Sequence, residues 1–112
     1  MKRGDVYDAR LYPTEGSEQS GVRPVIVVSR DAINTNSPVI VVVPVTKAEN
    51  VSRVYPNNVP IPSGSGGLTA DSIALGGQVR AIAKTRLLRR RGSLSPAIMA
   101  HVSRALRITL DI

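Results

Sequence analysis

Runs of β-branched residues fill the first half of the chain and predict a strand-rich fold. Residues 25–28 and 39–43 are unbroken stretches of Val and Ile, which is typical of central strands covered on both faces. From Val6 to Leu11 polar and apolar positions alternate, and this alternation predicts a half-buried strand. Three shorter strands are expected at residues 72–75, 78–84 and 59–61, the last at a sheet edge because of Pro60 and Pro62.

Turn-forming residues separate these segments. Residues 12–21 make a polar loop longer than a hairpin needs, and loops of that length are often functional. Residues 34–38 predict a turn that follows a single helical turn at residues 31–33. The Gly/Ser-rich residues 63–67 are expected to form a mobile surface connection, because no Lys-Ser/Thr follows them as in a phosphate-binding P-loop.

One amphipathic helix is predicted near the C-terminus. Ser95 is a good N-cap residue, and Pro96 suits the first helical position. The apolar residues that follow share one face at helical spacing: Ile98, Met99, Val102, Ala105, Leu106 and Leu110. Many short strands and one closing helix predict a single α+β domain over residues 1–112, built as a curved sheet or small barrel.

Charge is distributed unevenly along the chain, whose formal net charge is +7. Residues 80–112 carry eight basic residues and one acidic residue, whereas residues 1–79 carry seven of each. This asymmetry favours a polyanionic partner, either a nucleic acid or an acidic polypeptide. No signal peptide or membrane-spanning segment is recognisable, so we expect a soluble cytoplasmic protein without membrane contact.

Residues that could carry chemistry are few. Cysteine is absent, and the single histidine, His101, lies in the predicted terminal helix. No His, Asp or Glu cluster has metal-ligand spacing, so we expect neither a metal nor another cofactor. One reaction needs neither, because RNA can be cleaved by its own 2′-hydroxyl when a protein aligns that group and stabilises charge on the phosphate. Arginine suits the electrostatic part of this reaction.

Arg23 and Thr46 are the best candidates for this chemistry. Arg23 stands just before the strand at residues 25–28, and Thr46 follows the strand at residues 39–43. If the two strands are antiparallel neighbours, the start of one lies beside the end of the other and the two side chains meet. The alternative is an ordinary ion pair at the strand edge, with Glu18 as the partner of Arg23.

Nine different short motifs are spread along the whole chain, in a specific order and with specific spacing. They are Arg3–Tyr7, Pro13–Gln19, Arg23–Val27, Pro44–Thr46, Gly67–Leu68, Asp71–Ser72, Gln78–Arg80, Arg86–Leu87 and Gly92–Leu94. Together they resemble the MazF/PemK-type mRNA interferase toxins of bacterial type II toxin–antitoxin systems. The resemblance implies a small SH3-like β-barrel of the MazF/PemK/CcdB type with a C-terminal helix, assembled as a homodimer.

The same resemblance implies an activity and a set of partners. It implies a metal-independent, sequence-specific endoribonuclease that cleaves single-stranded RNA to cyclic phosphate and 5′-hydroxyl ends. It also implies a cognate antitoxin whose acidic C-terminal tail occupies the RNA groove. The catalytic Arg and Thr of the family fall on Arg23 and Thr46. The expected RNA-contacting residues are Gln78, Glu18, Gln19, Lys47 and Arg80.

Two positions depart from the family pattern. Lys47 stands where many members carry a small hydroxyl residue, and Gly77 stands where many carry an acidic one. Both lie near the expected RNA groove, so they bear on base specificity more than on the reaction type.

Two other functions fit the same fold class. A toxin that traps DNA gyrase would carry a C-terminal Trp-Gly-Ile, whereas this chain ends in Leu110–Ile112 without a Trp. A non-catalytic RNA-binding barrel would use the basic segment Lys84–Arg91 to contact phosphates.

Overall fold

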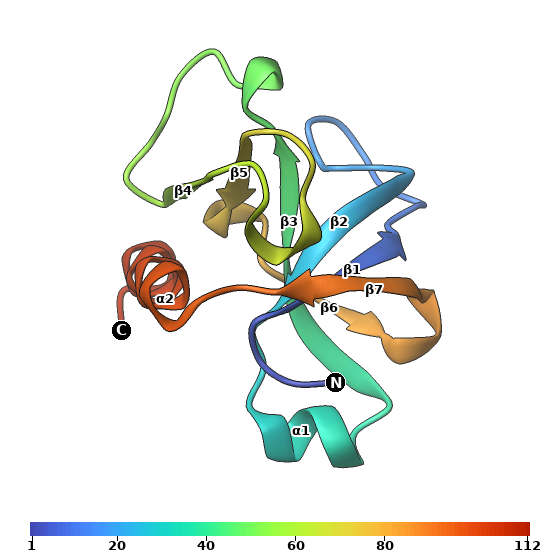
Figure 1. The fold of residues 1–112 in the computed structure, drawn as a ribbon. Helices are drawn as coiled ribbons and strands as arrows, with labels where there is room; N and C mark the ends of the chain where they lie inside the picture. Colours follow the sequence, from blue (N-terminus) through green and yellow to red (C-terminus); the bar gives the residue numbers. More distant parts are fainter.

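A computed structural model describes all residues, 1–112, and shows antiparallel strands with two α-helices (Figure 1). The strands are β1 (Asp5–Arg10), β2 (Val22–Val27), β3 (Val39–Lys47), β4 (Asn58–Ile61), β5 (Ser72–Leu75), β6 (Arg80–Ala83) and β7 (Leu87–Ser93). The helices are α1 (Asp31–Asn36) and α2 (Pro96–Leu110), and short 3₁₀ turns occupy Ala48–Asn50, Ser65–Gly67, Gly76–Gln78 and Lys84–Arg86. The expected α+β class is confirmed.

Strand β3 organises the sheet because it changes partners along its length. Residues 39–42 pair with β6, residues 42–44 pair with β2, and residues 45–47 pair with β5. Pro44 stands where the partner on one side changes from β6 to β5, so its missing N–H interrupts no ladder. The strand order is β4-β5-β3-β2-β1-β7, and β4 lies at an edge, as Pro60 and Pro62 predict.

The sheet is covered on both faces, which explains the continuous β-branched runs. Ile26 and Val43 belong to the larger buried cluster, whereas their neighbours Val25 and Val42 belong to the smaller one. Helix α2 closes the larger cluster through three buried residues, Met99, Val102 and Ala105. Its N-terminus is capped as predicted, because the Ser95 hydroxyl accepts a hydrogen bond from the Ile98 amide at 3.2 Å. Leu110 was expected on the same face but is 53% exposed in the last turn.

Two segments are folded differently from the sequence-based expectation. The strand expected at residues 78–84 is limited to β6, because 3₁₀ turns occupy Gly76–Gln78 before it and Lys84–Arg86 after it. The helical turn expected at residues 31–33 extends to Asn36, through residues expected to form a turn. The buried Asn34 side chain stabilises this extension by donating to the Ser29 carbonyl oxygen at 2.8 Å.

The Gly/Ser-rich segment, expected to form a mobile surface connection, lies close to β7 and its flanking residue Leu94 at Gly66 and Gly67. Gly66 is buried, and a Cβ there would lie 2.7 Å from Leu94 Cδ2. A Cβ on Gly67 would lie 2.1 Å from the Arg91 carbonyl oxygen. The glycines are therefore required by a close backbone approach to β7, a strand that the sequence pattern did not predict.

Neither α1 nor α2 combines the length and apolar character that a membrane crossing requires.

Candidate active site

The structure brings Arg23 and Thr46 together. Strands β2 and β3 are antiparallel neighbours with Val25 opposite Pro44, and continuing this register by two residues places Arg23 opposite Thr46. Both residues line one cleft of about 330 Å³. Arg23 was expected just before the strand, but it lies inside the strand. β2 begins at Val22, and Arg23 already pairs with Ala9 of β1.

The Arg23 guanidinium is free to bind a ligand. Arg23 is exposed, and its side chain forms no hydrogen bond or ion pair within the chain. The alternative ion pair with Glu18 is absent, because the Glu18 carboxylate instead accepts a hydrogen bond from the Glu15 amide at 3.2 Å. The paired strand fixes the backbone of Arg23 beside the cleft, and all the donors of its guanidinium are available.

A neighbouring amide sets the direction of the Thr46 hydroxyl. Asn50 Nδ2 donates to Thr46 Oγ1 at 3.2 Å, from the 3₁₀ turn that follows β3. A hydroxyl has one proton to donate, and accepting from Asn50 leaves that proton for another acceptor. Thr46 is therefore arranged as a hydrogen-bond donor, which suits the oxygen of a phosphate.

The remaining charges of the cleft are mostly positive. Lys47 and Arg91 line it together with Arg23, and Glu49 is the one carboxylate among its lining residues. Three cations against one anion favour a polyanionic ligand. Sequence reasoning missed Glu49 and Asn50, because the 3₁₀ turn that carries them shows no readable periodicity. It noted Arg91 only as part of the basic segment Lys84–Arg91 and did not place it beside Arg23 and Thr46.

Most of the expected RNA-contacting residues lie in a second, neighbouring hollow. Glu18, Gln19, Gln78 and Arg80 line this hollow of about 370 Å³, together with Pro44. Pro44 precedes Thr46 by two positions on β3, a separation of about 7 Å along a strand. Only Lys47 of the expected RNA-contacting set lines the cleft itself. The second hollow and the cleft therefore lie next to each other along β3, the hollow at Pro44 and the cleft at Thr46.

Gln78 holds the loop at residues 12–21 against the body of the protein. Its Oε1 atom accepts a hydrogen bond from the Gln19 amide at 2.9 Å, and its Nε2 atom donates to the Ser17 carbonyl oxygen at 3.3 Å. Arg80 Nη1 donates to the Leu11 carbonyl oxygen at 3.2 Å, just before the same loop. Both residues therefore position the loop that forms one wall of the second hollow.

His101 is not part of either hollow. It is exposed and borders a separate depression between α2 and β4. No three His, Asp or Glu side chains come together as a group that could hold a metal ion.

Comparison with known proteins assigns the chain to a toxin family. The pattern of the family described as PemK-like, MazF-like toxin of type II toxin–antitoxin system matches residues 2–110. The chain belongs to this family.

Individual relatives and solved structures agree with the assignment. The chain is 40% identical to Endoribonuclease MazF9 of Mycobacterium tuberculosis, covering 100% of this chain and 98% of that protein. It is 38% identical to Endoribonuclease MazF of Staphylococcus saprophyticus, covering 100% and 92%. A mycobacterial endoribonuclease solved with its cognate antitoxin superposes with a TM-score of 0.82 at 25% identity, covering 100% and 96%. MazF of Deinococcus radiodurans superposes with a TM-score of 0.84 at 24% identity, covering 100% and 97%.

Proposed function

We propose that this chain is the endoribonuclease toxin of a type II toxin–antitoxin system and cleaves single-stranded RNA without a metal. The observation that carries the proposal is the meeting of an unpaired Arg23 with a donor-oriented Thr46 in one cleft. The names of the relatives support the same activity. Neither gyrase poisoning nor non-catalytic RNA binding is favoured by a specific feature of the structure.

The proposed reaction places the scissile phosphate between these two side chains. The 2′-oxygen of the preceding ribose forms a bond to phosphorus, and the bond from phosphorus to the 5′-oxygen breaks. Arg23 and the Thr46 hydroxyl donate hydrogen bonds to the phosphoryl oxygens, whose negative charge increases in the transition state. The 2′-hydroxyl loses its proton as its oxygen bonds to phosphorus, and the departing 5′-oxygen takes a proton from water. The hydroxide left behind takes up the proton lost by the 2′-hydroxyl, and the products are a 2′,3′-cyclic phosphate and a 5′-hydroxyl.

Base recognition belongs to the second hollow in this proposal. Its residues Gln78, Arg80, Glu18 and Gln19 contact the bases that flank the cut, and Lys47 contacts the RNA in the cleft. The whole of residues 1–112 acts as one toxin domain in the cytoplasm, assembled as a homodimer. A cognate antitoxin with an acidic C-terminal tail competes for the positively charged cleft, because both ligands are polyanions.

Removing the Thr46 hydroxyl tests the site directly. Thr46→Ala is expected to slow cleavage of an unstructured RNA by about 10²–10³-fold in excess EDTA, because one donor to the phosphoryl oxygens is lost. Thr46→Ser keeps the hydroxyl and is expected to retain most activity. Thr35→Ala in α1 is the matched control, since Thr35 is exposed at the opposite end of β3. Full activity of Thr46→Ala would contradict the proposal.

Glu49 is the residue proposed to accept the proton of the 2′-hydroxyl. Arginine and lysine are protonated at neutral pH, so the one carboxylate lining the cleft is its available base. Glu49 precedes Asn50, the residue bonded to Thr46, on the same 3₁₀ turn. Glu49→Gln is expected to lower the single-turnover cleavage rate by about 10²-fold or more. Asp111→Asn, at the exposed C-terminal end of α2, is the charge-matched control; equal rates for both variants would remove Glu49 from the mechanism.

A further inference from the structure

Arg91 occupies an irregular position in β7. Val6 of β1 pairs with Gly92, whereas the next residue, Tyr7, pairs with Arg90. Arg91 is therefore the extra residue of a β-bulge, without a partner on β1. Bulges redirect a side chain out of the regular alternation of a strand, and they are common beside active sites. Here the redirected side chain lines the cleft that contains Arg23 and Thr46.

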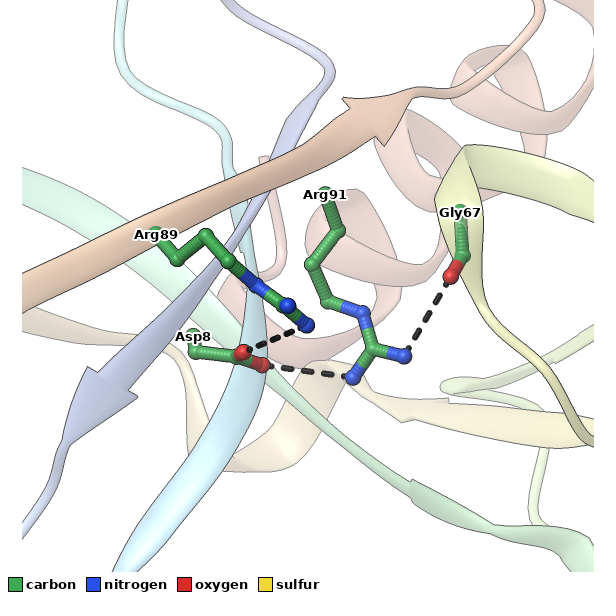
Figure 2. A network of polar contacts seen from close by, with 4 residues as sticks. All are labelled: Asp8, Gly67, Arg89 and Arg91. Atoms are coloured by element: carbon green, nitrogen blue, oxygen red, sulfur yellow. Dashed lines mark hydrogen bonds and ion pairs between the residues drawn. The ribbon is translucent and has the colours of Figure 1, made fainter.

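Two hydrogen bonds hold the Arg91 guanidinium in place (Figure 2). Nη1 donates to Asp8 Oδ1 at 3.2 Å, and Nη2 donates to the Gly67 carbonyl oxygen at 3.3 Å. The side chain is 18% exposed, so little of it is surrounded by water. Arg91 is thus an oriented cation, in contrast to the flexible basic residues of a solvated surface.

The charge and donors of Arg91 are only partly satisfied by these contacts. Asp8 is shared with Arg89, whose Nη2 lies 3.4 Å from Asp8 Oδ2, so one carboxylate faces two guanidinium groups. Each terminal nitrogen of Arg91 has a second N–H that these bonds do not use. The buried Nε atom has no hydrogen-bond partner. A partly desolvated cation with spare donors at a cleft wall is suited to an anionic ligand.

We propose that Arg91 forms a second phosphate-binding position of the cleft and contacts a phosphodiester of the bound RNA strand. This inference rests on the proposed function, in which Arg23 binds the scissile phosphate. Asp8 and the Gly67 carbonyl oxygen position the guanidinium of Arg91, while Arg89 shares Asp8 but does not line the cleft. The alternative is that Arg91 only joins β1, β7 and the segment around Gly67.

Salt dependence of RNA binding separates these two roles. The probe is a fluorescent 20-nucleotide unstructured RNA with 2′-O-methyl groups throughout, which the protein can bind but cannot cleave. Loss of one contact to a phosphate of a single strand lowers the slope of log K against log salt by about 0.7. Arg91→Gln is expected to show this decrease and about 10-fold weaker binding at low salt, since a hydrogen bond between two charged groups is lost. Arg91→Lys is expected to keep the slope.

Arg89→Gln is the matched control, because it removes the same charge from the same carboxylate partner. Its side chain is 72% exposed and does not line the cleft, so its slope is expected to equal that of the wild type. An unchanged slope for folded Arg91→Gln, or an equal decrease for Arg89→Gln, would overturn the assignment.

A measurement on the wild-type protein covers the case in which Arg91→Gln fails to fold. The ¹⁵N resonance of Arg91 Nε is expected to shift when the 2′-O-methyl RNA is added, and that of Arg89 is not. No shift at Arg91 under saturating RNA would overturn the assignment. Cleavage of the unmodified RNA is measured in parallel, so an inactive wild type would count against the proposed function and leave the binding result to be judged separately.

Discussion

Replacing Arg23 with alanine is expected to reduce the RNA cleavage rate by about 10³-fold or more, the range found when an arginine that stabilises a transferring phosphate is removed. The stability of the protein is expected to change by less than about 0.5 kcal/mol, because exposed side chains without contacts contribute little. Arg23 is such a side chain, with no intramolecular hydrogen bond or ion pair. Single-turnover cleavage and urea denaturation measured on one preparation would check both parts.

Two variants control this experiment. Arg30→Ala removes the same charge from an exposed residue before α1, at the far ends of β2 and β3 from the cleft (Figure 1). It is expected to cleave RNA at the wild-type rate. Arg23→Lys keeps the charge but loses the planar fork, so an intermediate rate is expected. The mechanism is wrong if Arg23→Ala and Arg30→Ala cleave equally fast.

Replacing Gly67 with alanine is expected to lower the free energy of unfolding by about 2–4 kcal/mol, combining strain at a positive φ with overpacking. Gly67 has a φ of +73°, and its added Cβ would lie 2.1 Å from the Arg91 carbonyl oxygen. That neighbour is backbone, so it can move away only if the bulge of β7 is displaced. Urea denaturation followed by circular dichroism measures the change.

Gly64 supplies the matched control for backbone strain. Its φ is +92°, yet nothing lies within 4 Å of the position that a Cβ would occupy. Gly64→Ala is therefore expected to cost only about 1–2 kcal/mol, the penalty of a left-handed conformation. Equal losses for the two alanine variants would show that the contact with β7 does not contribute to stability.

The proximity of Arg23 and Thr46 followed from the sequence only under one condition. Two uninterrupted β-branched runs predict central strands, and if these strands are antiparallel neighbours, the start of one lies beside the end of the other. The structure has this arrangement, with Val25 opposite Pro44. The helix cap at Ser95 was predictable because its signal is local.

Strand β7 was not predictable because its pattern is not periodic. Three consecutive arginines, Arg89–Arg91, hide the alternation of a strand, and bulges at Leu88 and Arg91 shift its register against β1. Asp8 stabilises this basic strand from across the sheet, a contact between residues 83 positions apart in the chain. Only the tertiary structure shows that Arg91 lines the cleft whereas Arg89 does not.

The packing of the Gly/Ser-rich segment, residues 63–67, was also not predictable from local sequence. Its composition is typical of a flexible connection, because glycine allows conformations that other residues rarely adopt. Gly66 and Gly67 instead lie against Leu94 and the backbone of β7, where a side chain would not fit. These glycines are needed because their segment closely approaches β7, which is distant in sequence. A local sequence pattern cannot predict such a contact.

Cleavage of a long unstructured RNA by the purified protein in excess EDTA, with analysis of the product ends, tests the central claim most directly. We expect cuts at a short recurring sequence, each leaving a 2′,3′-cyclic phosphate and a 5′-hydroxyl, with no cuts by Arg23→Ala. Cleavage only after a divalent metal is added, or products with 5′-phosphate ends, would contradict attack by the 2′-hydroxyl in the cleft of Arg23 and Thr46.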